Sequence, residues 1–480
     1  RLVLDLVVNH TSDEHPWFEE ARKSRHNPYY NYYHWWPAEK GEPPLRLSYF
    51  DEEGNAWTYN KPTDSYYLHY FSRKQPDLNW ENPEVRQEIF DMMRFWFDKG
   101  IDGFRMDSIS LIAKDPSFPL IDSKKYPDIF SFYAKEPRLH LYLHEMNRQV
   151  LSKYDCMSVG EGSAVMVDDV AKFVDPAREE LNMLYHFDAA RIRNTTLPDN
   201  PESGIDYSLI ALKKMFTEWE KAVDKGWPSI YLGNHDQPRM VSRFGSDKDE
   251  FRALSAKMLI TFLLTMKGTP YWFAGDEIGM RNIRFDRIEN YNDIDTINRY
   301  KKAKAEGTDP QAVLDEQKET GRDNARTPFQ WDRSPEAGFT AGTPWLKVNP
   351  DYTWINVTDE EKDPTSILNY FKKVVSFRKE NPSLIYGSYH LLDAENPQSY
   401  TFLRKTGADT YLIMLNFSPK AAISTPGIDM SNAHVLLDNY GARSHMAPQK
   451  DITLRPFEAI VFQLNHPVYE SFIDSLDLLE

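Results

Sequence analysis

The sequence lacks the features that mark several classes of protein. Cys156 is the single cysteine among 480 residues, so the chain has no internal disulfide framework and no cysteine-based metal cluster. No apolar run approaches the roughly 20 residues that a membrane-spanning helix needs. Positive charge is scarce and scattered, since 57 Lys and Arg against 73 Asp and Glu give a net charge of −16. The negative net charge and the scattered positive residues argue against a protein that binds the phosphate backbone of nucleic acid.

Two common catalytic motifs are also missing. No glycine-rich loop precedes a predicted helix, so phosphate or nucleotide chemistry lacks support. No G-x-S-x-G sequence is present, which removes the commonest hydrolase nucleophile. Aromatic residues, by contrast, make up 14% of the chain, and many stand in polar, loop-like stretches. Rings in such surroundings suit pockets that stack against the apolar faces of ligands, sugars among them.

Short apolar segments alternate with amphipathic ones along most of the chain. In residues 83–99, Val85, Ile89, Met92, Met93 and Trp96 are predicted to share one face of a helix. Repeated strand–helix units of this kind predict a parallel sheet, and so many in series favour a TIM (β/α)8 barrel, an α/β fold. Strands are predicted at residues 2–8, 102–106, 156–159, 183–187, 229–232 and 270–273, and further helices near 168–173, 207–223, 251–266, 293–304 and 366–379.

The texture of the sequence changes at three places. Residues 11–82 are rich in Tyr, Trp, His and Pro without a sustained period, and predict an inserted loop domain. Residues 385–466 alternate like strands and predict a C-terminal antiparallel β-sandwich. The catalytic barrel then comprises residues 1–10 and 83–384, and residues 467–480 form a tail with one short helix. Because Arg1 opens directly into a buried strand, we expect the chain to be a fragment.

Polar residues stand at the ends of four predicted strands. In a TIM barrel such positions line the active site. Taken singly, an Asp after a strand is more often a helix N-cap, and a lone His is usually structural. Together they predict one site. These residues are His10, Arg105, Asp107, Glu161, His235 and Asp236.

Several chemistries could use such residues. Metal ligation is conceivable, but the residues lack the local spacing of known metal motifs. Paired carboxylates beside aromatic rings in an acidic protein fit cleavage of a glycosidic bond. There, one carboxylate attacks the anomeric carbon, while a second, kept protonated by its environment, donates a proton to the leaving oxygen.

At these strand ends the sequence resembles the α-amylase family of glycoside hydrolases, within it the oligo-1,6-glucosidase and α-glucosidase group. Four conserved regions of the family occur in order, and three further stretches are similar to that group in particular. The resemblance extends from Arg1 to about residue 466. The four regions are 5–10 (DLVVNH), 103–107 (GFRMD), 159–161 (VGE) and 233–236 (GNHD), and the group stretches are 75–80 (QPDLNW), 268–271 (GTPY) and 321–331 (GRDNARTPFQW).

The resemblance implies a catalytic role for each carboxylate. Asp107 would be the nucleophile, Glu161 the general acid/base, and Asp236 the carboxylate that helps distort the sugar and stabilises the transition state. Arg105 lies two residues before Asp107 on one strand, so both point to the same face and the arginine would hold Asp107 ionised.

The substrate-binding residues follow from the same resemblance. His10 and His235 would bind hydroxyl groups of the sugar. Phe71 and Arg322 match positions that wall the pocket and bind the non-reducing glucose. Plain packing is the alternative for Phe71, and a structural salt bridge is the alternative for Arg322.

The sequence departs from the group's pattern in two ways. Barrel strands one and two would lie upstream of Arg1, together with pocket residues and the loop that often binds a structural calcium or magnesium ion. No cofactor is required for the chemistry itself. Ser108 follows the nucleophile at a position where α-1,6-specific relatives carry Val, and this small polar residue favours α-1,4 cleavage. Residues 162–164 (GSA), which follow the acid/base, match neither of the two sequences common in the group at that position.

The leading hypothesis is a retaining, exo-acting α-glucosidase that removes terminal glucose from short oligosaccharides or disaccharides, maltose- or isomaltose-type. The alternative is a sucrose isomerase, trehalulose synthase or glucosyltransferase of the same family, because residues 283–287 (IRFDR) partly match an arginine-rich loop of sucrose-isomerising relatives. A non-catalytic relative like the amino-acid-transporter heavy chains is disfavoured, because all three catalytic carboxylates, Asp107, Glu161 and Asp236, are present. We expect no nucleic-acid or membrane partner, and a cytoplasmic location.

Overall fold

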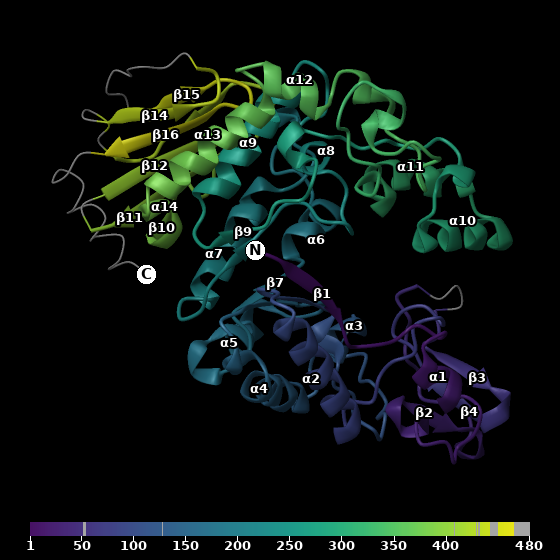
Figure 1. Cartoon of the computed structure of the whole chain (residues 1–480). Coiled ribbons are helices and arrows are strands. Elements are labelled where there is room, and N and C mark those ends of the chain that lie inside the picture. The colour runs from purple at the N-terminus through teal and green to yellow at the C-terminus, as the bar shows by residue number, and fades with distance from the viewer. Residues whose placement is uncertain are drawn as a thin grey trace. The chain divides into compact units, whose positions relative to one another are not determined.

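The computed structural model describes residues 1–50, 54–126, 128–407, 409–428, 430, 433–441 and 450–464. The chain divides into two compact units (Figure 1). Unit 1 comprises Arg1–Phe187 and Lys221–Pro228, and unit 2 comprises Asp188–Glu220 and Ser229–Glu480.

Unit 1 is built on a parallel sheet in the order β1-β5-β6-β7. Val7 pairs with Asp107 and Met106 with Gly160, so neighbouring strands end at one edge. The four strands predicted in this part of the chain are confirmed. They are β1 (Val3–Val7), β5 (Gly103–Asp107), β6 (Met157–Glu161) and β7 (Met183–Tyr185), accompanied by α2 (Pro83–Asp98), α3 (Phe130–Tyr133), α4 (Arg138–Gln149) and α5 (Ala171–Val174).

Helix α2 begins where the sequence provides a cap. The Asn82 side chain accepts a hydrogen bond from the backbone N–H of Glu84, and Pro83 occupies the first turn. The predicted buried face is wrong at one residue: Trp96 is 40% exposed, whereas Phe97 is buried. The buried stripe advances in steps of four from Val85, and the fourth residue on that path is Phe97.

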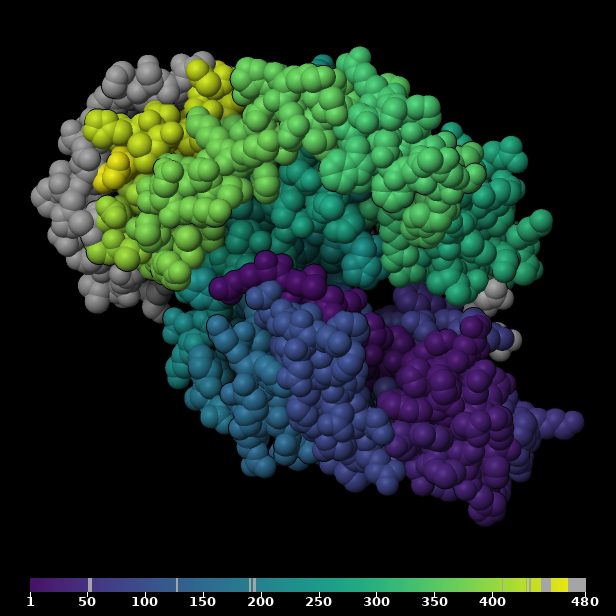
Figure 2. Space-filling model, viewed as in Figure 1, coloured from purple at the N-terminus to yellow at the C-terminus, as the bar shows by residue number. Residues whose placement is uncertain are grey.

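The first strand of this sheet lies at its edge. In the described residues β1 pairs only with β5, and Leu2, Val3 and Val7 are exposed at the molecular surface (Figure 2, dark purple). A groove of about 820 Å³ runs beside β1 and α2 and reaches His10, with Trp17 and Phe95 among its lining residues.

The segment that follows β1 folds into a small antiparallel sheet with the strand order β2-β4-β3. Its core is aromatic: the ring of Phe18 makes edge contacts with Tyr33 and Tyr67 at centroid distances of 5.0 Å each. The return limb runs beside the end of β1, where His10 bridges to Asp77. The elements are α1 (Pro16–Ala21), β2 (Trp35–Pro37), β3 (Trp57–Asn60) and β4 (Ser65–Leu68).

Unit 2 contains a parallel pair of short strands, β8 (Ser229–Ile230) and β9 (Thr269–Pro270). Both are shorter than predicted, and β9 begins one residue earlier than the predicted 270–273. Helix α9 (Arg252–Thr265) is buried almost all round, which explains its strongly apolar sequence. The other helices are α6 (Asp188–Thr195), α7 (Leu209–Ala222), α8 (Met240–Phe244), α10 (Ile294–Glu306), α11 (Pro310–Thr320), α12 (Val357–Lys362), α13 (Ile367–Glu380) and α14 (Ser383–Tyr386).

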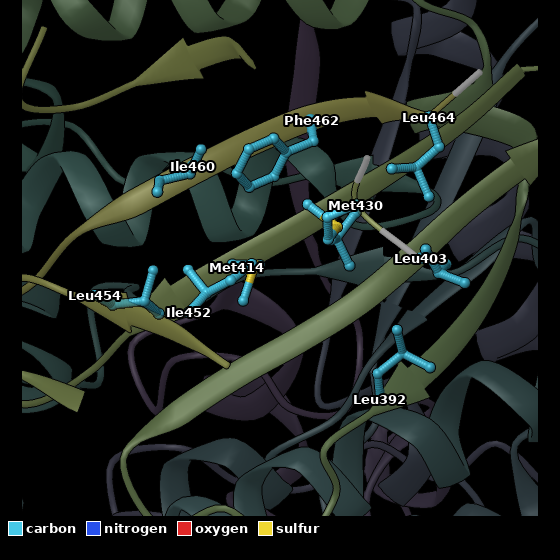
Figure 3. Close-up of a cluster of buried hydrophobic side chains, with 10 residues drawn as sticks. Leu392, Leu403, Met414, Met430, Ile452, Leu454, Ile460, Phe462 and Leu464 are labelled. Carbon is cyan, nitrogen blue, oxygen red and sulfur yellow. The ribbon is translucent and has the colours of Figure 1, made fainter. Parts of the chain in front are cut away.

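The C-terminal part of unit 2 is antiparallel, as predicted. A five-stranded sheet in the order β10-β11-β12-β16-β14 and the pair β13-β15 share one apolar core, which includes Leu403, Leu412, Ile452 and Phe462 (Figure 3). The tail helix predicted at 467–480 lies outside the described residues. The strands are β10 (Ser388–Leu392), β11 (Ser399–Thr406), β12 (Asp409–Asn416), β13 (Ala422–Ser424), β14 (His434–Asp438), β15 (Ile452–Leu454) and β16 (Ala459–Leu464).

Candidate active site

Two carboxylates end neighbouring parallel strands in unit 1. Asp107 is the last residue of β5 and Glu161 the last residue of β6. Arg105 lies between them: its Nη1 is 2.7 Å from Asp107 Oδ1, and its Nη2 is 2.7 Å from Glu161 Oε2. The same Nη1 is 2.9 Å from Oδ1 of Asp5 on β1. One guanidinium therefore joins three strands through three carboxylates.

The two strand-end carboxyls have pKa values that move in opposite directions. Burial raises the pKa of Glu161 to about 8, and the negative charge of Asp107 adds to this effect. Burial alone would also raise the pKa of Asp107, but the charge of Arg105 and hydrogen bonds from Arg105 and Glu161 outweigh it and lower that pKa. These opposite shifts favour an ionised Asp107 and a protonated Glu161 at neutral pH.

The residue after Asp107 positions Glu161 through its backbone. Ser108 adopts a left-handed conformation with φ of 44°, which is uncommon for a residue other than glycine. Its backbone N–H donates a hydrogen bond to Glu161 Oε2 at 3.0 Å. Strain at a single residue next to two reactive carboxyls is typical of a functional site.

His10 lies just beyond the end of β1 and is buried. Its Nδ1 is 3.2 Å from Asn9 Nδ2, its Nε2 is 3.1 Å from Gln75 Nε2, and its ring centroid is 5.1 Å from that of Phe71. Burial lowers the pKa of His10 and outweighs the opposing charges of Asp77 and Asp107. The lowered pKa favours the neutral imidazole, and each ring nitrogen faces a side-chain amide.

A second cluster of charged residues lies in unit 2 around Asp236. Arg326 Nη2 is 2.6 Å and Arg322 Nη1 3.3 Å from Asp236 Oδ1, and His235 Nε2 is 3.3 Å from Asp236 Oδ2. Arg322 also donates from Nε to Asp293 Oδ1 at 2.8 Å. Although burial alone would lower the pKa of Arg322, the carboxylates of Asp293 and Asp236 raise it, so this arginine stays charged.

The eight residues predicted from the sequence therefore fall into two groups. His10, Phe71, Arg105, Asp107 and Glu161 lie in unit 1, and each of them contacts, or acts electrostatically on, another member of that group. The remaining three lie in unit 2 and contact one another through the carboxylate of one of them: His235, Asp236 and Arg322.

Sequence reasoning missed three charged residues of these clusters. Asp5 stands inside the first conserved region, on the same strand face as its partner Arg105. Arg326 belongs to the stretch 321–331 that resembles the α-glucosidase group, and this resemblance was the sequence feature that could have identified it. Asp293 caps α10, with its side chain accepting from the backbone N–H of Thr296, so its sequence context suggested only a helix start.

Comparison with known proteins shows the family of the chain. The model of the α-amylase catalytic domain matches residues 1–387. The chain belongs to the α-amylase family. Among curated members, the oligo-1,6-glucosidase of Parageobacillus thermoglucosidasius is 48% identical over 478 residues, covering 97% of this chain and 84% of that protein. That of Bacillus cereus is 45% identical, covering 97% of this chain and 83% of that protein.

Solved structures of the family have the same fold. A trehalulose synthase in complex with Tris matches with a TM-score of 0.90 at 38% identity, covering 97% of this chain and 84% of that one. The isomaltulose synthase of Protaminobacter rubrum also matches with a TM-score of 0.90 at 38% identity, covering 97% and 83%. This member of the α-amylase family is a glycoside hydrolase with a TIM-barrel fold and a C-terminal antiparallel sheet.

Metal-binding clusters and membrane-spanning helices are both absent from the part of the chain that the structure describes. Within that part of the chain, no group of three or more His, Cys, Asp or Glu side chains could hold a metal ion. None of the described helices has both the length and the apolar character needed to cross a membrane.

Proposed function

We propose that the chain is a retaining, exo-acting α-glucosidase that releases terminal α-linked glucose from short oligosaccharides. The observation that carries this proposal is that Arg105 contacts both Asp107 and Glu161, while the pKa of Asp107 is lowered and that of Glu161 is raised. A nucleophile and a proton donor are the two groups that a retaining glycosidase needs. The relatives named oligo-1,6-glucosidase support the substrate class.

The proposed reaction has two displacements. Asp107 attacks the anomeric carbon while Glu161 donates its proton to the glycosidic oxygen, so the bond to the leaving sugar breaks and a glucosyl ester forms. Glu161, now a carboxylate, then takes a proton from water as that water attacks the same carbon and releases Asp107. Two inversions give glucose with its original α configuration.

The remaining predicted residues receive roles in binding. We propose that Asp236, held by Arg322 and Arg326, binds sugar hydroxyls and stabilises the transition state. His10 and His235 would bind further hydroxyls, and Phe71, in ring contact with His10, would wall the pocket. The reaction as proposed uses side chains alone, so dialysis against EDTA should leave kcat unchanged in protein that stays folded.

The finer assignment of the fold is part of the same proposal. β1 would be the third strand of the barrel, as the likeness of residues 5–10 to the family's first conserved region indicates. Residues 11–82 would be the inserted domain and residues 385–466 a C-terminal β-sandwich. A cytoplasmic location remains a prediction of the sequence, to be tested by cell fractionation.

Sucrose isomerisation is the second candidate, since solved structures similar to this chain include sucrose-isomerising enzymes. Of the two arginines in residues 283–287, Arg284 favours hydrolysis instead. Arg284 is held by two carboxylates, with its Nη1 2.6 Å from Asp247 and its Nε 2.7 Å from Glu319. Arg287 is 74% exposed and pairs with Glu289 at 3.2 Å. An arginine already bound by two carboxylates has few donors left for a sugar.

A substrate panel tests the proposal. Maltose, isomaltose, panose, trehalose, sucrose and p-nitrophenyl α-glucoside are incubated with the enzyme, and the products are followed by proton NMR. We expect free glucose from the oligosaccharides, glucose that appears first as the α-anomer from p-nitrophenyl α-glucoside, and no turnover by the Asp107→Ala variant. Glucose appearing first as the β-anomer from p-nitrophenyl α-glucoside, or conversion of sucrose to isomaltulose or trehalulose as the main reaction, would contradict the proposal.

A further inference from the structure

A lysine that belongs to none of the predicted roles is buried beside the catalytic strand. Lys114 follows the turn after β5, and its side chain and that of Asp77 are both 0% exposed, with Nζ 3.1 Å from Asp77 Oδ2. The ammonium also lies 5.0 Å from the centre of the Tyr70 ring. Removing two opposite charges from water is costly unless further polar contacts compensate. The other contacts of this pair therefore indicate what it does.

The buried pair fixes the orientation of one side-chain amide, that of Asn9. Lys114 Nζ donates to Asn9 Oδ1 at 2.6 Å, and Asn9 Nδ2 donates to Asp77 Oδ1 at 3.3 Å. Turning the amide over would set its N–H groups against an ammonium and its oxygen against a carboxylate. Asn9 is itself fully buried, so water cannot replace either contact. Its oxygen consequently faces Lys114, and its nitrogen faces away.

The fixed amide determines what the next residue can do. The second hydrogen of Asn9 Nδ2 faces His10 Nδ1 at 3.2 Å, so Nδ1 is the acceptor and the ring proton resides on Nε2. Gln75 also approaches Nε2, but a single backbone hydrogen bond, from Ser72 N–H to Gln75 Oε1 at 3.2 Å, holds its orientation. The amide of Gln75 can turn, whereas that of Asn9 cannot. The neutral Nε2–H form of His10 follows.

We propose that Lys114 is a positioning residue: with Asp77 it fixes Asn9, which makes His10 present an Nε2–H donor to a hydroxyl of the bound sugar. This inference rests on the proposed function for its sugar ligand. The three segments it joins are the end of β1, the return limb that carries Asp77, and the turn that follows the nucleophile. Lys114 thus connects the sugar-binding histidine to the strand that carries Asp107.

The charges around His10 make its pKa depend on Lys114, so the proposal can be tested by the pH dependence of activity. The groups that act on the imidazole are Asp77 and Asp107, which raise its pKa, and Lys114, which lowers it together with burial. Replacing Lys114 by an uncharged residue leaves both carboxylates unopposed and frees Asn9 to turn. The pKa of His10 then rises, and its cationic form, which the Asn9 N–H group opposes, becomes populated at higher pH.

The test begins with Lys114→Met, which keeps an unbranched side chain and removes the charge. We expect kcat/KM on maltose to fall about tenfold or more, because the Nδ1–H form of His10, which has no donor at Nε2, becomes populated. We also expect a further acid limb, set by His10, above the one that Asp107 sets. Because a stranded Asp77 could unfold the chain, the pair Asp77→Asn with Lys114→Met is measured as well, since it removes both buried charges together. The same loss of kcat/KM is expected in the double variant, with a smaller rise in the pKa of His10, because the charge of Asp77 no longer acts on the imidazole.

A matched control separates positioning from the general cost of removing a buried lysine. Lys213 is also buried, and its Nζ bonds to the backbone carbonyls of Asp393, Asn396 and Ser399 at 3.0, 2.7 and 3.2 Å in unit 2. Lys213→Met should lower thermal stability and leave the pH profile of the folded enzyme unchanged. In a His10→Ala background, Lys114→Met should cost less than about twofold in kcat/KM, because its route of action is gone.

A direct readout does not depend on turnover. In protein with ¹⁵N-labelled histidine, long-range NMR correlations identify the tautomer of His10, assigned by its disappearance in His10→Ala. We expect the Nε2–H form in the wild type, and a mixture with a higher pKa in Lys114→Met. An unchanged tautomer and pKa, or additive losses in the His10→Ala background, would overturn the role of Lys114. Absence of glucose release from every α-glucoside by the wild type would instead overturn the proposed function, while the NMR result still decides the tautomer.

Discussion

Asp107 and Glu161 are chemically similar side chains that their surroundings make different. Both are largely buried, and desolvation taken alone would raise the pKa of each. Arg105 donates to both, but Glu161 is more deeply buried and lies beside the negative charge that Arg105 stabilises on Asp107. When two close carboxyls share one cation, the first to ionise raises the pKa of the second. At the residue scale, this asymmetry assigns the nucleophile and the acid.

The first prediction concerns the pH dependence of kcat/KM on maltose. Asp107 must be ionised, and its pKa is lowered. The acid limb of the kcat/KM profile, which Asp107 governs, therefore lies below the usual pKa range of aspartate. Glu161 must be protonated, and its pKa is raised to about 8, so activity falls as the pH rises through about 8. Initial rates from about pH 4 to about pH 10 check this. An alkaline limb near the ordinary glutamate pKa would contradict the assignment of Glu161.

The second prediction separates the acid from the nucleophile. Glu161→Gln should reduce maltose hydrolysis by about a thousandfold, within the range usual for loss of a general acid. Nitrophenolate leaves without a proton, so this variant should still show a fast first turnover on p-nitrophenyl α-glucoside, measured by stopped flow. Asp107→Asn, the control, should show no such burst. Equal loss of the burst in both variants would mean that Glu161 is not the proton donor.

At the scale of elements, close contact between β5 and β6 brings the two carboxyls together. A Cβ atom at Gly103 would lie 2.1 Å from the backbone oxygen of Met157, its partner in the parallel register. No side-chain rotation relieves a clash with backbone. Glycine at this position therefore permits the strand pairing that places Asp107 beside Glu161.

The third prediction follows from that contact. Gly103→Ala should lower the free energy of unfolding by more than about 2 kcal/mol, because the strands must separate to accommodate the methyl group. Urea denaturation followed by circular dichroism measures it. Gly342→Ala is the control, since its nearest neighbour would be Thr340 Oγ1 at 3.7 Å, and it should change stability by less than about 0.5 kcal/mol. Comparable losses in the two variants would count against a close-packed β5–β6 interface.

The strands were the part of the fold that local sequence could predict. Parallel strands are rich in apolar residues, so β1, β5, β6 and β7 stand out in the sequence without knowledge of their neighbours, although β1 proves to be an exposed edge strand. The error at Trp96 arose because helical period alone does not decide where a wide apolar stripe meets the sheet. The strand-end residues could be predicted as well, since position on a strand determines where a side chain stands.

Contacts between distant segments could not be predicted in the same way. Lys114 pairs with Asp77 and Asn9, which lie 37 and 105 positions earlier in the chain. Its one local sign is a charged residue that ends the apolar run from Ile109 to Ala113. The pairing of Arg322 with Asp293 depends in the same way on how separate segments fold together.

At the scale of the whole molecule, the C-terminal core supplies apolar burial remote in sequence from the carboxylates. Leu412 on β12 is 0% exposed within that core, whereas Ile423 on β13 is 61% exposed. Our fourth prediction is that Leu412→Ala lowers the free energy of unfolding by about 2–5 kcal/mol through loss of burial and a residual cavity. Ile423→Ala, the matched control, should stay within about 0.5 kcal/mol. Calorimetry of both variants decides, and equal effects would refute a packed C-terminal core.

The guanidinium of Arg105 has a consequence for the timing of proton transfer. In the proposed reaction Asp107 becomes an uncharged ester, so the negative charge that helps to raise the pKa of Glu161 disappears. Arg105 keeps its charge and has only Asp5 and Glu161 left to neutralise it. The pKa of Glu161 must then fall, and the side chain becomes a proton acceptor when water needs one. Glu161 is therefore an acid before the ester forms and a base while the ester exists, so the covalent state of Asp107 sets the order of the two half-reactions.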